Sequence, residues 1–288
     1  MMPRIMPVRE PGECRCGAAP RLSPVAGRFP ESVLTHIGYI NDSRSASGDN
    51  GAMKTTTHTS RPGLLDTAEI ETASAPEWTI LWLHGLGADG HDFAPIVPEL
   101  VRDDWPGLRF VFPHAPVRAV TINNGARMRA WYDIRDFDLA NRADEAGVVE
   151  SVGQVEALIA HQAERGIPAN RVLLAGFSQG GAVTLAAGLG RKAPLAGLVV
   201  LSAYLPFRPE AIATLADTVH EGARTQPLFM AHGQQDPVVP FSAGAGSATR
   251  LKALGFDTSW HAYPMAHQVC AEQIRDLGDW MGRRFDSR

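Results

Sequence analysis

The chain has 288 residues, of which 44% are hydrophobic and 20% are charged, as expected for a globular protein with a substantial core. Its 27 basic and 31 acidic residues give a net charge of −4, so the chain lacks the excess of Lys and Arg that characterises nucleic-acid-binding proteins. No apolar stretch approaches the roughly 18 residues that a membrane-spanning helix needs. The three cysteines, Cys14, Cys16 and Cys270, are too few for a disulfide framework and favour a reducing compartment. We therefore expect a cytoplasmic protein that neither binds nucleic acid nor spans a membrane.

The first 75 residues differ in composition from the rest of the chain. They contain seven of the 21 prolines and several short polar runs, and they sustain no hydrophobic period of two or 3.6 residues. Such a segment cannot bury enough apolar surface to offset its chain entropy, so we predict that residues 1–60 are disordered and that residues 61–288 form the folded domain. The segment also lacks the apolar core of a signal peptide. We expect translation to begin at Met53, with the preceding residues absent from the native protein.

From residue 76 onward, short apolar runs alternate with helical patterns. Apolar residues recur at intervals of three or four over 148–162 and 269–281, which predicts two amphipathic helices. The alternation indicates an α/β fold, with a mainly parallel sheet and helices on both faces. In such sheets ligands bind beyond the carboxyl ends of the strands, so chemistry is expected in the loops that follow them. The runs that read as strands are 78–83, 108–112, 171–177, 198–201, 227–231 and 258–263.

The most specific pattern is the G-x-S-x-G sequence at 176–180, between a predicted strand and a predicted helix. Glycines on both sides of Ser178 relieve crowding in a tight turn that projects the serine hydroxyl. The N–H of Gln179, at the start of the following helix, is placed to stabilise a developing oxyanion. This pattern predicts that Ser178 is a nucleophile.

A serine hydroxyl reacts only when a base takes its proton and an acid orients that base. In this architecture the order along the chain is Ser, Asp or Glu, then His. Four histidines follow Ser178. We expect His261 on a sheet face, His232 at a strand end where it packs against or hydrogen-bonds the loop, and His220 in a helix or loop. His267 follows the last predicted strand and precedes the last helix, so it is the predicted base.

The orienting acid is expected in the loop after the preceding strand. Asp236 follows the run 227–231, and it lies 58 residues after Ser178 and 31 before His267. An Asp-Pro sequence also nucleates turns, which is the alternative role of this residue. Asp217, in a helix-like stretch, and Asp257, at the start of a strand, are worse placed. Asp236 is therefore the predicted acid.

A glycine-rich loop at 83–90 follows the first strong strand and contains a literal G-x-G-x-x-G. Dinucleotide binding would need a helix directly after the glycines and an acid at the end of the next strand, and neither is present. We expect the loop instead to turn backbone N–H groups toward the serine as a second oxyanion donor. His84 is expected to brace this loop rather than bind a metal.

Seven blocks of sequence, in order along the chain from residue 76, resemble the carboxylesterase / acyl-protein thioesterase family, the phospholipase/carboxylesterase group of α/β-hydrolases. The resemblance implies that Ser178, Asp236 and His267 form a catalytic triad and that the backbone amides of Leu86 and Gln179 form the oxyanion hole. It also implies that Trp131 lines an acyl pocket. Ala266 departs from the glycine expected there, which concerns loop geometry. The blocks are 83–93, 112–116, 128–134, 176–181, 201–204, 232–239 and 263–267.

The implied activity is hydrolysis of carboxylic esters, and of acyl thioesters, through an acyl-enzyme that needs no cofactor and no metal. The expected substrate is a small-molecule ester or thioester with a short to medium acyl chain. Acyl-protein thioesterase or lysophospholipase activity is the alternative, and a non-catalytic ligand-binding scaffold is a more remote one. A homodimer is a possible assembly. The residues expected to form an apolar acyl cleft or ordinary core are Leu86, Phe93, Trp131, Tyr132, Leu205 and Phe207.

Overall fold

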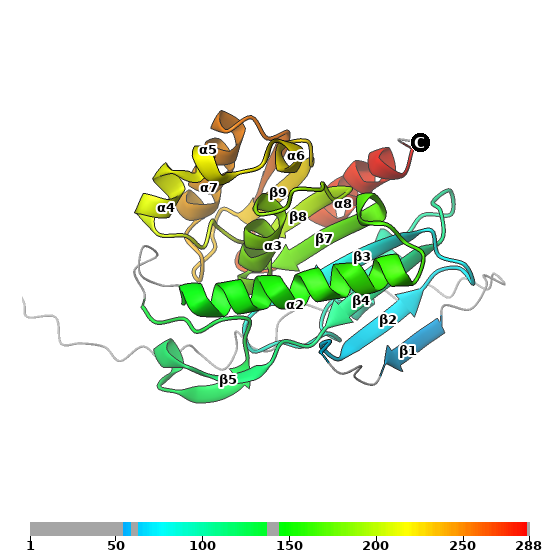
Figure 1. The fold of residues 1–288 in the computed structure, drawn as a ribbon, viewed down its shortest axis with the longest axis horizontal. Coiled ribbons are helices and arrows are strands. Elements are labelled where there is room, and N and C mark those ends of the chain that lie inside the picture. Colours follow the sequence, from blue (N-terminus) through cyan, green and yellow to red (C-terminus); the bar gives the residue numbers. More distant parts are fainter. Residues whose placement is uncertain (1–53, 59–62, 137–143, 287–288) are drawn as a thin grey trace, which may run out of the picture. The chain divides into compact units, whose positions relative to one another are not determined.

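A computed structural model describes residues 54–58, 63–136 and 144–286 (Figure 1). Within these residues, eight strands form one sheet in the order β1-β2-β4-β3-β7-β8-β9-β10, and a hairpin of two strands lies apart from it. The strands of the sheet are β1 (Lys54–His58), β2 (Thr67–Glu71), β3 (Trp78–Leu83), β4 (Leu108–Pro113), β7 (Val172–Phe177), β8 (Gly197–Leu201), β9 (Leu228–Gly233) and β10 (Thr258–Tyr263), and those of the hairpin are β5 (Val117–Val120) and β6 (Ala126–Arg129).

The sheet is mainly parallel, as the sequence predicts. Strands β4, β3, β7, β8, β9 and β10 pair in parallel, whereas β2 pairs antiparallel with both β1 and β4. The strands in the middle of the sheet are buried on both faces; all six residues of β3 are buried, for example. A strand covered on both sides has no polar face, which explains its continuous apolar sequence.

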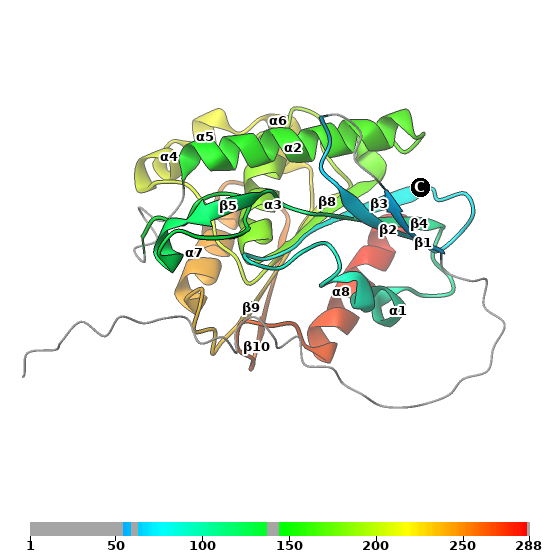
Figure 2. The same cartoon turned by 90° about the horizontal axis from the view of Figure 1, so that it is seen from below.

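Helices cover both faces of the sheet, which confirms the predicted α/β architecture. Figure 2 shows α2 and α3 on one face and α1 and α8 on the other. The core divides in the same way, because Leu81 and Leu83 of β3 pack in the cluster with α2 and α3, while Ile80 and Trp82 pack with α1 and α8. The helices are α1 (Val97–Leu100), α2 (Glu145–Glu164), α3 (Gln179–Leu189), α4 (Pro209–Ala213), α5 (Leu215–Thr218), α6 (Glu221–Arg224), α7 (Phe241–Ala253) and α8 (Ala271–Phe285).

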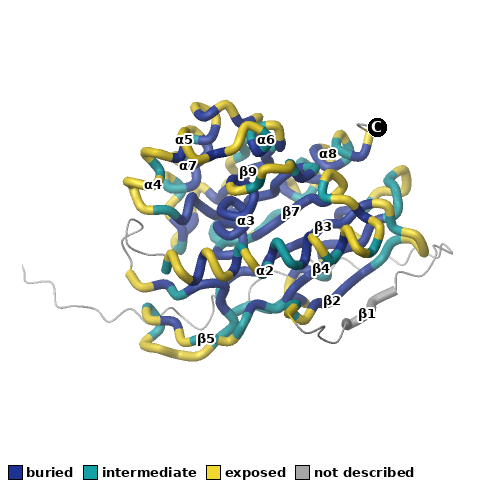
Figure 3. Tube along the Cα trace, viewed as in Figure 1, coloured by how far each residue is buried: buried dark blue, intermediate teal, exposed yellow. Residues whose placement is uncertain are grey.

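The two helices predicted from apolar periodicity are α2 and α8, each a few residues longer than its pattern. Figure 3 shows buried and exposed residues alternating along α2, as an amphipathic helix requires. Val155 and Leu158 are buried against the sheet, whereas Val149 on the opposite side is 71% exposed. The periodicity therefore identified the packed face of α2 as well as its existence.

The sheet begins earlier than the sequence predicts. Strand β1, at 54–58, falls in the segment expected to be disordered, yet it pairs with β2 over five residues. Strand β1 lies at the edge of the sheet and β2 lies between β1 and β4. Neither forms a strong apolar run, since polar residues alternate with apolar ones in β2, the sequence of which is TAEIE. The rest of the predicted disordered segment, together with the expected start at Met53, lies outside the described residues.

The parallel strands bring four loops to one edge of the sheet. Leu83 at the end of β3 pairs with Gly176 near the end of β7, and Gly233 at the end of β9 pairs with Tyr263 at the end of β10. The loops after these strands carry the residues that the sequence singles out. This edge is the one where α/β sheets bind their ligands.

Candidate active site

Ser178 occupies a strained turn between β7 and α3. Its φ of 54° and ψ of −119° lie in a region that residues other than glycine seldom adopt. The two glycines of the motif allow the chain to pack at this turn. A Cβ on Gly176 would lie 2.3 Å from the carbonyl oxygen of Gly180, and a Cβ on Gly180 would lie 2.4 Å from that of Leu83. The glycines thus permit the close approach of strand, helix and loop that exposes the serine side chain.

The three side chains predicted to form a triad are joined by hydrogen bonds. Nε2 of His267 lies 2.9 Å from Oγ of Ser178, and Nδ1 of His267 lies 2.7 Å from Oδ2 of Asp236. The Asp236 side chain has no exposed surface and that of His267 is 10% exposed. These distances allow a proton to pass from the hydroxyl to the imidazole while the carboxylate fixes the ring.

Asp236 is held as an anion by several donors. Its Oδ1 accepts the N–H groups of Val238 and Val239, each at 2.8 Å, so the turn predicted as its alternative role is also present. Burial alone would raise the pKa of this carboxyl, but hydrogen bonds from His232, His267 and the Val239 backbone outweigh burial and lower the pKa below its usual range. The carboxylate is therefore ionised at neutral pH.

His267 lies in the loop between β10 and α8, next to an aromatic ring. The ring of Phe177 lies 4.8 Å from the imidazole, centroid to centroid. The backbone of the loop packs on Gly233, where a Cβ would lie 2.3 Å from the carbonyl oxygen of Ala266. Ala266 is not among the described residues with positive φ, so the loop accommodates alanine without left-handed backbone. The departure from glycine at this position therefore leaves the imidazole in place.

The two predicted oxyanion donors belong to segments that meet at the serine. Gln179 is the first residue of α3, where the turn leaves backbone N–H groups without helical partners. The loop that carries Leu86 lies against the nucleophile, since a Cβ on Gly85 would be 3.5 Å from Cβ of Ser178. The N–H of Gly87, in the same loop, instead donates a hydrogen bond to the carbonyl of Arg129 at 2.8 Å.

Trp131 was expected to line an acyl pocket, but its side chain is fully buried. Its indole N–H donates to the carbonyl of His84 at 2.9 Å, and its backbone N–H donates to Oε1 of Gln179 at 2.8 Å. The side-chain amide of Gln179 also donates to the carbonyl of Tyr132 at 2.7 Å. Trp131 thus links the glycine-rich loop to the start of α3, and it presents no surface to a bound acyl group.

The other histidines occupy the positions that the sequence suggests. His84 bonds the carbonyl of Gly85 at 2.7 Å and accepts the Ala115 N–H at 3.0 Å, so it braces its loop. His232 is fully buried and donates to the carbonyl of Val239 at 2.9 Å. His261 stacks on Phe229 on the face of the sheet. His220 is the residue before α6.

The apolar residues proposed as cleft or core divide into two groups. Leu86 and Phe207 are partly buried and pack against the edge of the core. The other four are buried core residues: Phe93, Trp131, Tyr132 and Leu205. Only the first group retains surface with which to contact a substrate.

Two features of the site were not found from the sequence. Phe177, the variable residue before the serine, contacts the His267 ring, and the side chain of Gln179 bonds residues 131–132. The contact between Phe177 and His267 has only a weak signal in the sequence, namely an aromatic residue beside the nucleophile. The hydrogen bonds of the Gln179 side chain join it to residues 47 and 48 positions earlier in the chain, and no local pattern indicates them.

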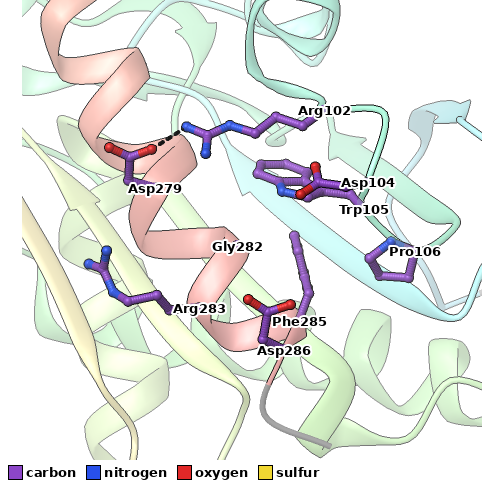
Figure 4. A pocket seen from close by; sticks show the side chains of 9 residues that line it. All are labelled: Arg102, Asp104, Trp105, Pro106, Asp279, Gly282, Arg283, Phe285 and Asp286. Atoms are coloured by element: carbon purple, nitrogen blue, oxygen red, sulfur yellow. Dashed lines mark hydrogen bonds and ion pairs between the residues drawn. The ribbon is translucent and has the colours of Figure 1, made fainter.

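A pocket at the opposite end of the sheet contains none of these residues. It lies near the start of β4, between Trp105 and Phe285 of α8, with Arg102 and Asp279 in an ion pair of 2.5 Å (Figure 4). Among the described residues there is no cluster of three or more His, Cys, Asp or Glu side chains suited to a metal ion. Cys14 and Cys16 lie outside them. None of the helices in the described part of the chain has the length and apolar character that a bilayer span requires.

Comparison with known proteins decides the family. Residues 65–282 match the sequence profile of the Phospholipase/Carboxylesterase family. The chain is a member of this family. Carboxylesterase SOBER1 of Arabidopsis thaliana is 36% identical over 209 residues, which cover 72% of this chain and 90% of that protein. Acyl-protein thioesterase 1 of Cryptococcus neoformans is 34% identical over 237 residues, covering 76% of this chain and 98% of that protein.

The fold of the family is present as well. The crystal structure of SOBER1 matches with a TM-score of 0.66 and 35% identity, over 72% of this chain and 98% of that one. The crystal structure of acyl-protein thioesterase 2 of Zea mays matches with a TM-score of 0.67 and 27% identity, over 76% and 98% of the two chains. The predicted α/β-hydrolase fold and the resemblance to this family are confirmed.

Proposed function

We propose that this member of the phospholipase/carboxylesterase family hydrolyses carboxylic esters through an acyl-enzyme on Ser178. Membership of the family makes the chain a carboxylic ester hydrolase. The observation that carries the mechanism is the unbroken chain of hydrogen bonds from the Ser178 hydroxyl through His267 to Asp236. Acyl transfer by a serine needs a nucleophile, a base and an orienting acid in this order.

In the first half-reaction, Oγ of Ser178 attacks the ester carbonyl carbon while Nε2 of His267 takes the hydroxyl proton. Asp236 holds the imidazole in the tautomer with Nε2 free and stabilises the imidazolium that forms. The C–O bond of the ester then breaks, and the imidazolium donates its proton to the leaving alcohol. For a thioester, the C–S bond breaks and a thiol leaves. Ser178 now carries the acyl group.

The second half-reaction repeats these steps with water. His267 takes a proton from the water as its oxygen attacks the acyl carbon, and the imidazolium returns the proton to Ser178 as the acid is released. In both halves the carbonyl oxygen becomes an anion. We assign its stabilisation to the backbone N–H groups of Leu86 and Gln179, whose segments meet at the serine. The reaction uses only these groups, the substrate and water, with no cofactor.

For the substrate, we propose esters with short to medium acyl chains. The partly buried side chains of Leu86 and Phe207 offer apolar contact to an acyl group. Because related proteins are named acyl-protein thioesterase 1 and carboxylesterase, acyl thioesters are the second candidate substrates, with lysophospholipids as a further alternative. Because Trp131 is fully buried, we assign it no role in acyl binding.

A series of p-nitrophenyl esters and matched acyl thioesters from two to sixteen carbons tests this proposal, with kcat/KM measured for each. We expect a maximum at short to medium length among the esters. A maximum at the longest thioesters, with esters at least a hundred-fold poorer, would instead favour the acyl-protein thioesterase alternative.

A non-catalytic scaffold is separated from an enzyme by a fluorophosphonate probe, which reacts only with an activated serine. We expect stoichiometric labelling of Ser178 in the native protein. An unlabelled protein that still binds ester analogues would support the scaffold.

We also propose a cytoplasmic location, because the three cysteines are too few for a disulfide framework. Fractionation of native cells with an antibody to the chain tests it. A homodimer stays a proposal, and sedimentation velocity would detect it as twice the mass of one chain.

A further inference from the structure

His84 follows β3 and is 1% exposed, and both nitrogens of its ring have partners. The backbone N–H of Ala115 donates to Nε2 at 3.0 Å, so Nε2 carries no proton. The proton of the neutral ring is therefore on Nδ1, which donates it to the carbonyl of Gly85 at 2.7 Å. The two contacts fix both the tautomer and the orientation of the ring.

The ring stays neutral under ordinary conditions. Burial lowers the pKa of His84 to about 4, and this effect outweighs the hydrogen bond to Gly85 and the nearby charges of Asp92 and Asp89, which raise the pKa. His114, also near the ring, lowers it further. His84 is thus unsuited to proton transfer at neutral pH, and the mechanism above makes no use of it.

The carbonyl that His84 holds belongs to the same peptide unit as the Leu86 N–H. A trans peptide is planar, and its C=O and N–H point in opposite directions. Because the described residues contain no cis peptide bond, the Leu86 N–H points away from the His84 ring. Fixing the carbonyl of Gly85 therefore fixes the direction of the proposed oxyanion donor.

The preceding peptide unit is held in the same manner. The carbonyl of His84, which shares a peptide with the N–H of Gly85, accepts the indole N–H of Trp131 at 2.9 Å. Behind it, Gly180 of α3 lies in direct contact with the loop, since a Cβ there would be 2.6 Å from the same carbonyl oxygen. Two successive peptides of the loop are thus fixed by buried donors before a substrate binds.

We propose that His84 is a positioning residue for ester hydrolysis, whose Nδ1–H holds and polarises the Gly85–Leu86 peptide so that the Leu86 N–H is aimed at the oxyanion. A hydrogen bond to a peptide carbonyl makes the N–H of the same peptide a stronger donor, because the two dipoles polarise one another. A donor fixed in advance needs no reorganisation when charge develops, which is how such groups lower the barrier. This inference rests on the proposed function.

Two substitutions at position 84 separate this role from simple packing. In His84→Asn, the amide nitrogen occupies the place of Nδ1 and still donates to Gly85, while the contact with Ala115 is lost. In His84→Gln, the longer side chain reaches the place of Nε2 and still accepts from Ala115, while the donor to Gly85 is lost. Each variant thus keeps one of the two hydrogen bonds.

We expect His84→Gln to lower kcat about 10- to 100-fold with KM changed less than about three-fold, since removal of a whole oxyanion donor costs about 100- to 1,000-fold. His84→Asn should keep a kcat at least ten-fold higher than that of His84→Gln. Affinity for a boronic acid, which forms a tetrahedral anion on the serine, should fall in parallel with kcat/KM. Equal kcat values for the two variants, or a kcat that follows only their Tm, would overturn the proposal.

A measurement on the unsubstituted protein covers the case in which a variant does not fold. Nitrogen-15 NMR of the histidine rings should show His84 as the Nδ1–H tautomer, with its proton signal moving downfield when the boronic acid binds. The opposite tautomer, or an unmoved signal, would contradict the role. Failure of the fluorophosphonate to label Ser178 would contradict the proposed function, whereas equal variants of a protein that does label would contradict only the role of His84.

Discussion

The site consists of two regions that differ in their contact with water. The proposed acid–base side, Ser178 and His267, lies at the rim of the sheet, and its residues are partly exposed. The proposed oxyanion side is supported by His84, Trp131 and Gln179, which are 1%, 0% and 4% exposed. A nucleophile must meet substrate and water, whereas a fixed donor works best where water cannot compete for it. Changes at the rim should therefore affect chemistry alone, and changes in the support should affect chemistry and stability together.

The largest expected effect is that of Ser178→Ala. Loss of the nucleophile should lower kcat toward p-nitrophenyl butyrate by about four to six orders of magnitude. The substitution keeps the Cβ and the turn, so the Tm should stay within about two degrees. Steady-state kinetics and thermal unfolding measured on the same preparation check both parts, and near-normal turnover would contradict the assignment of the rim.

Asp236→Asn comes next, with an expected loss in kcat of about 10⁴, because the amide no longer favours the productive tautomer of His267. This variant also has a pH signature. The folded-state pKa of Asp236 is lowered, so its stabilisation is present above the unfolded pKa of about 3.9 and is lost as pH falls toward the folded value. Urea unfolding at several pH values should show wild type more stable than the variant near pH 7, with the gap narrowing below about pH 4. A difference in stability between the two proteins that does not change with pH would argue against a charged Asp236 in the folded protein.

Trp131→Phe tests the buried support directly. It removes the indole N–H and leaves the carbonyl of His84 buried without that donor, which should lower the free energy of unfolding by about 1–3 kcal/mol. We also expect kcat to fall about ten-fold, with little change in KM. Urea unfolding and initial rates measure the two losses. A matched control is Trp105→Phe, at the far end of the sheet, which should leave kcat unchanged.

The last prediction concerns the pH dependence of stability at His84. Its pKa falls from 6.5 to about 4 on folding, so below pH 6.5 the unfolded chain binds a proton that the folded chain does not. Stability should therefore rise with pH between about 4 and 6.5, by up to about 1.4 kcal/mol per pH unit from this residue. His84→Asn should lose this part of the slope, while His114, whose pKa is also lowered by burial, still contributes in both proteins. Parallel slopes for the two proteins would contradict the lowered pKa.

The sequence predicted those features that local patterns encode. The six apolar runs are strands of the sheet. The positions of Ser178, Asp236 and His267 in the loops that follow these strands led to their prediction as site residues. The strand β2 and the helix α7 were missed because their apolar signals are weak. Helix α7 is rich in small residues, and it packs closely instead: a Cβ on Gly244 would lie 2.3 Å from Nδ1 of His232.

The buried support of the oxyanion side could not be predicted from the sequence in the same way. The family resemblance marked Trp131 as important but suggested contact with substrate. Its actual partners, His84 and the side chain of Gln179, lie 47 and 48 residues away along the chain. Such links depend on how three segments pack, and no periodicity or spacing records them. Burial of the indole, seen only in the folded protein, favours a support over a pocket wall.

The central claim is that Ser178 is the activated nucleophile, and the mass of the protein after reaction with a fluorophosphonate tests it most directly. We predict one adduct per chain, located by peptide mapping on Ser178, and none on the Ser178→Ala variant under the same conditions. An unreacted native protein, or an adduct on another residue that persists in the variant, would contradict the account.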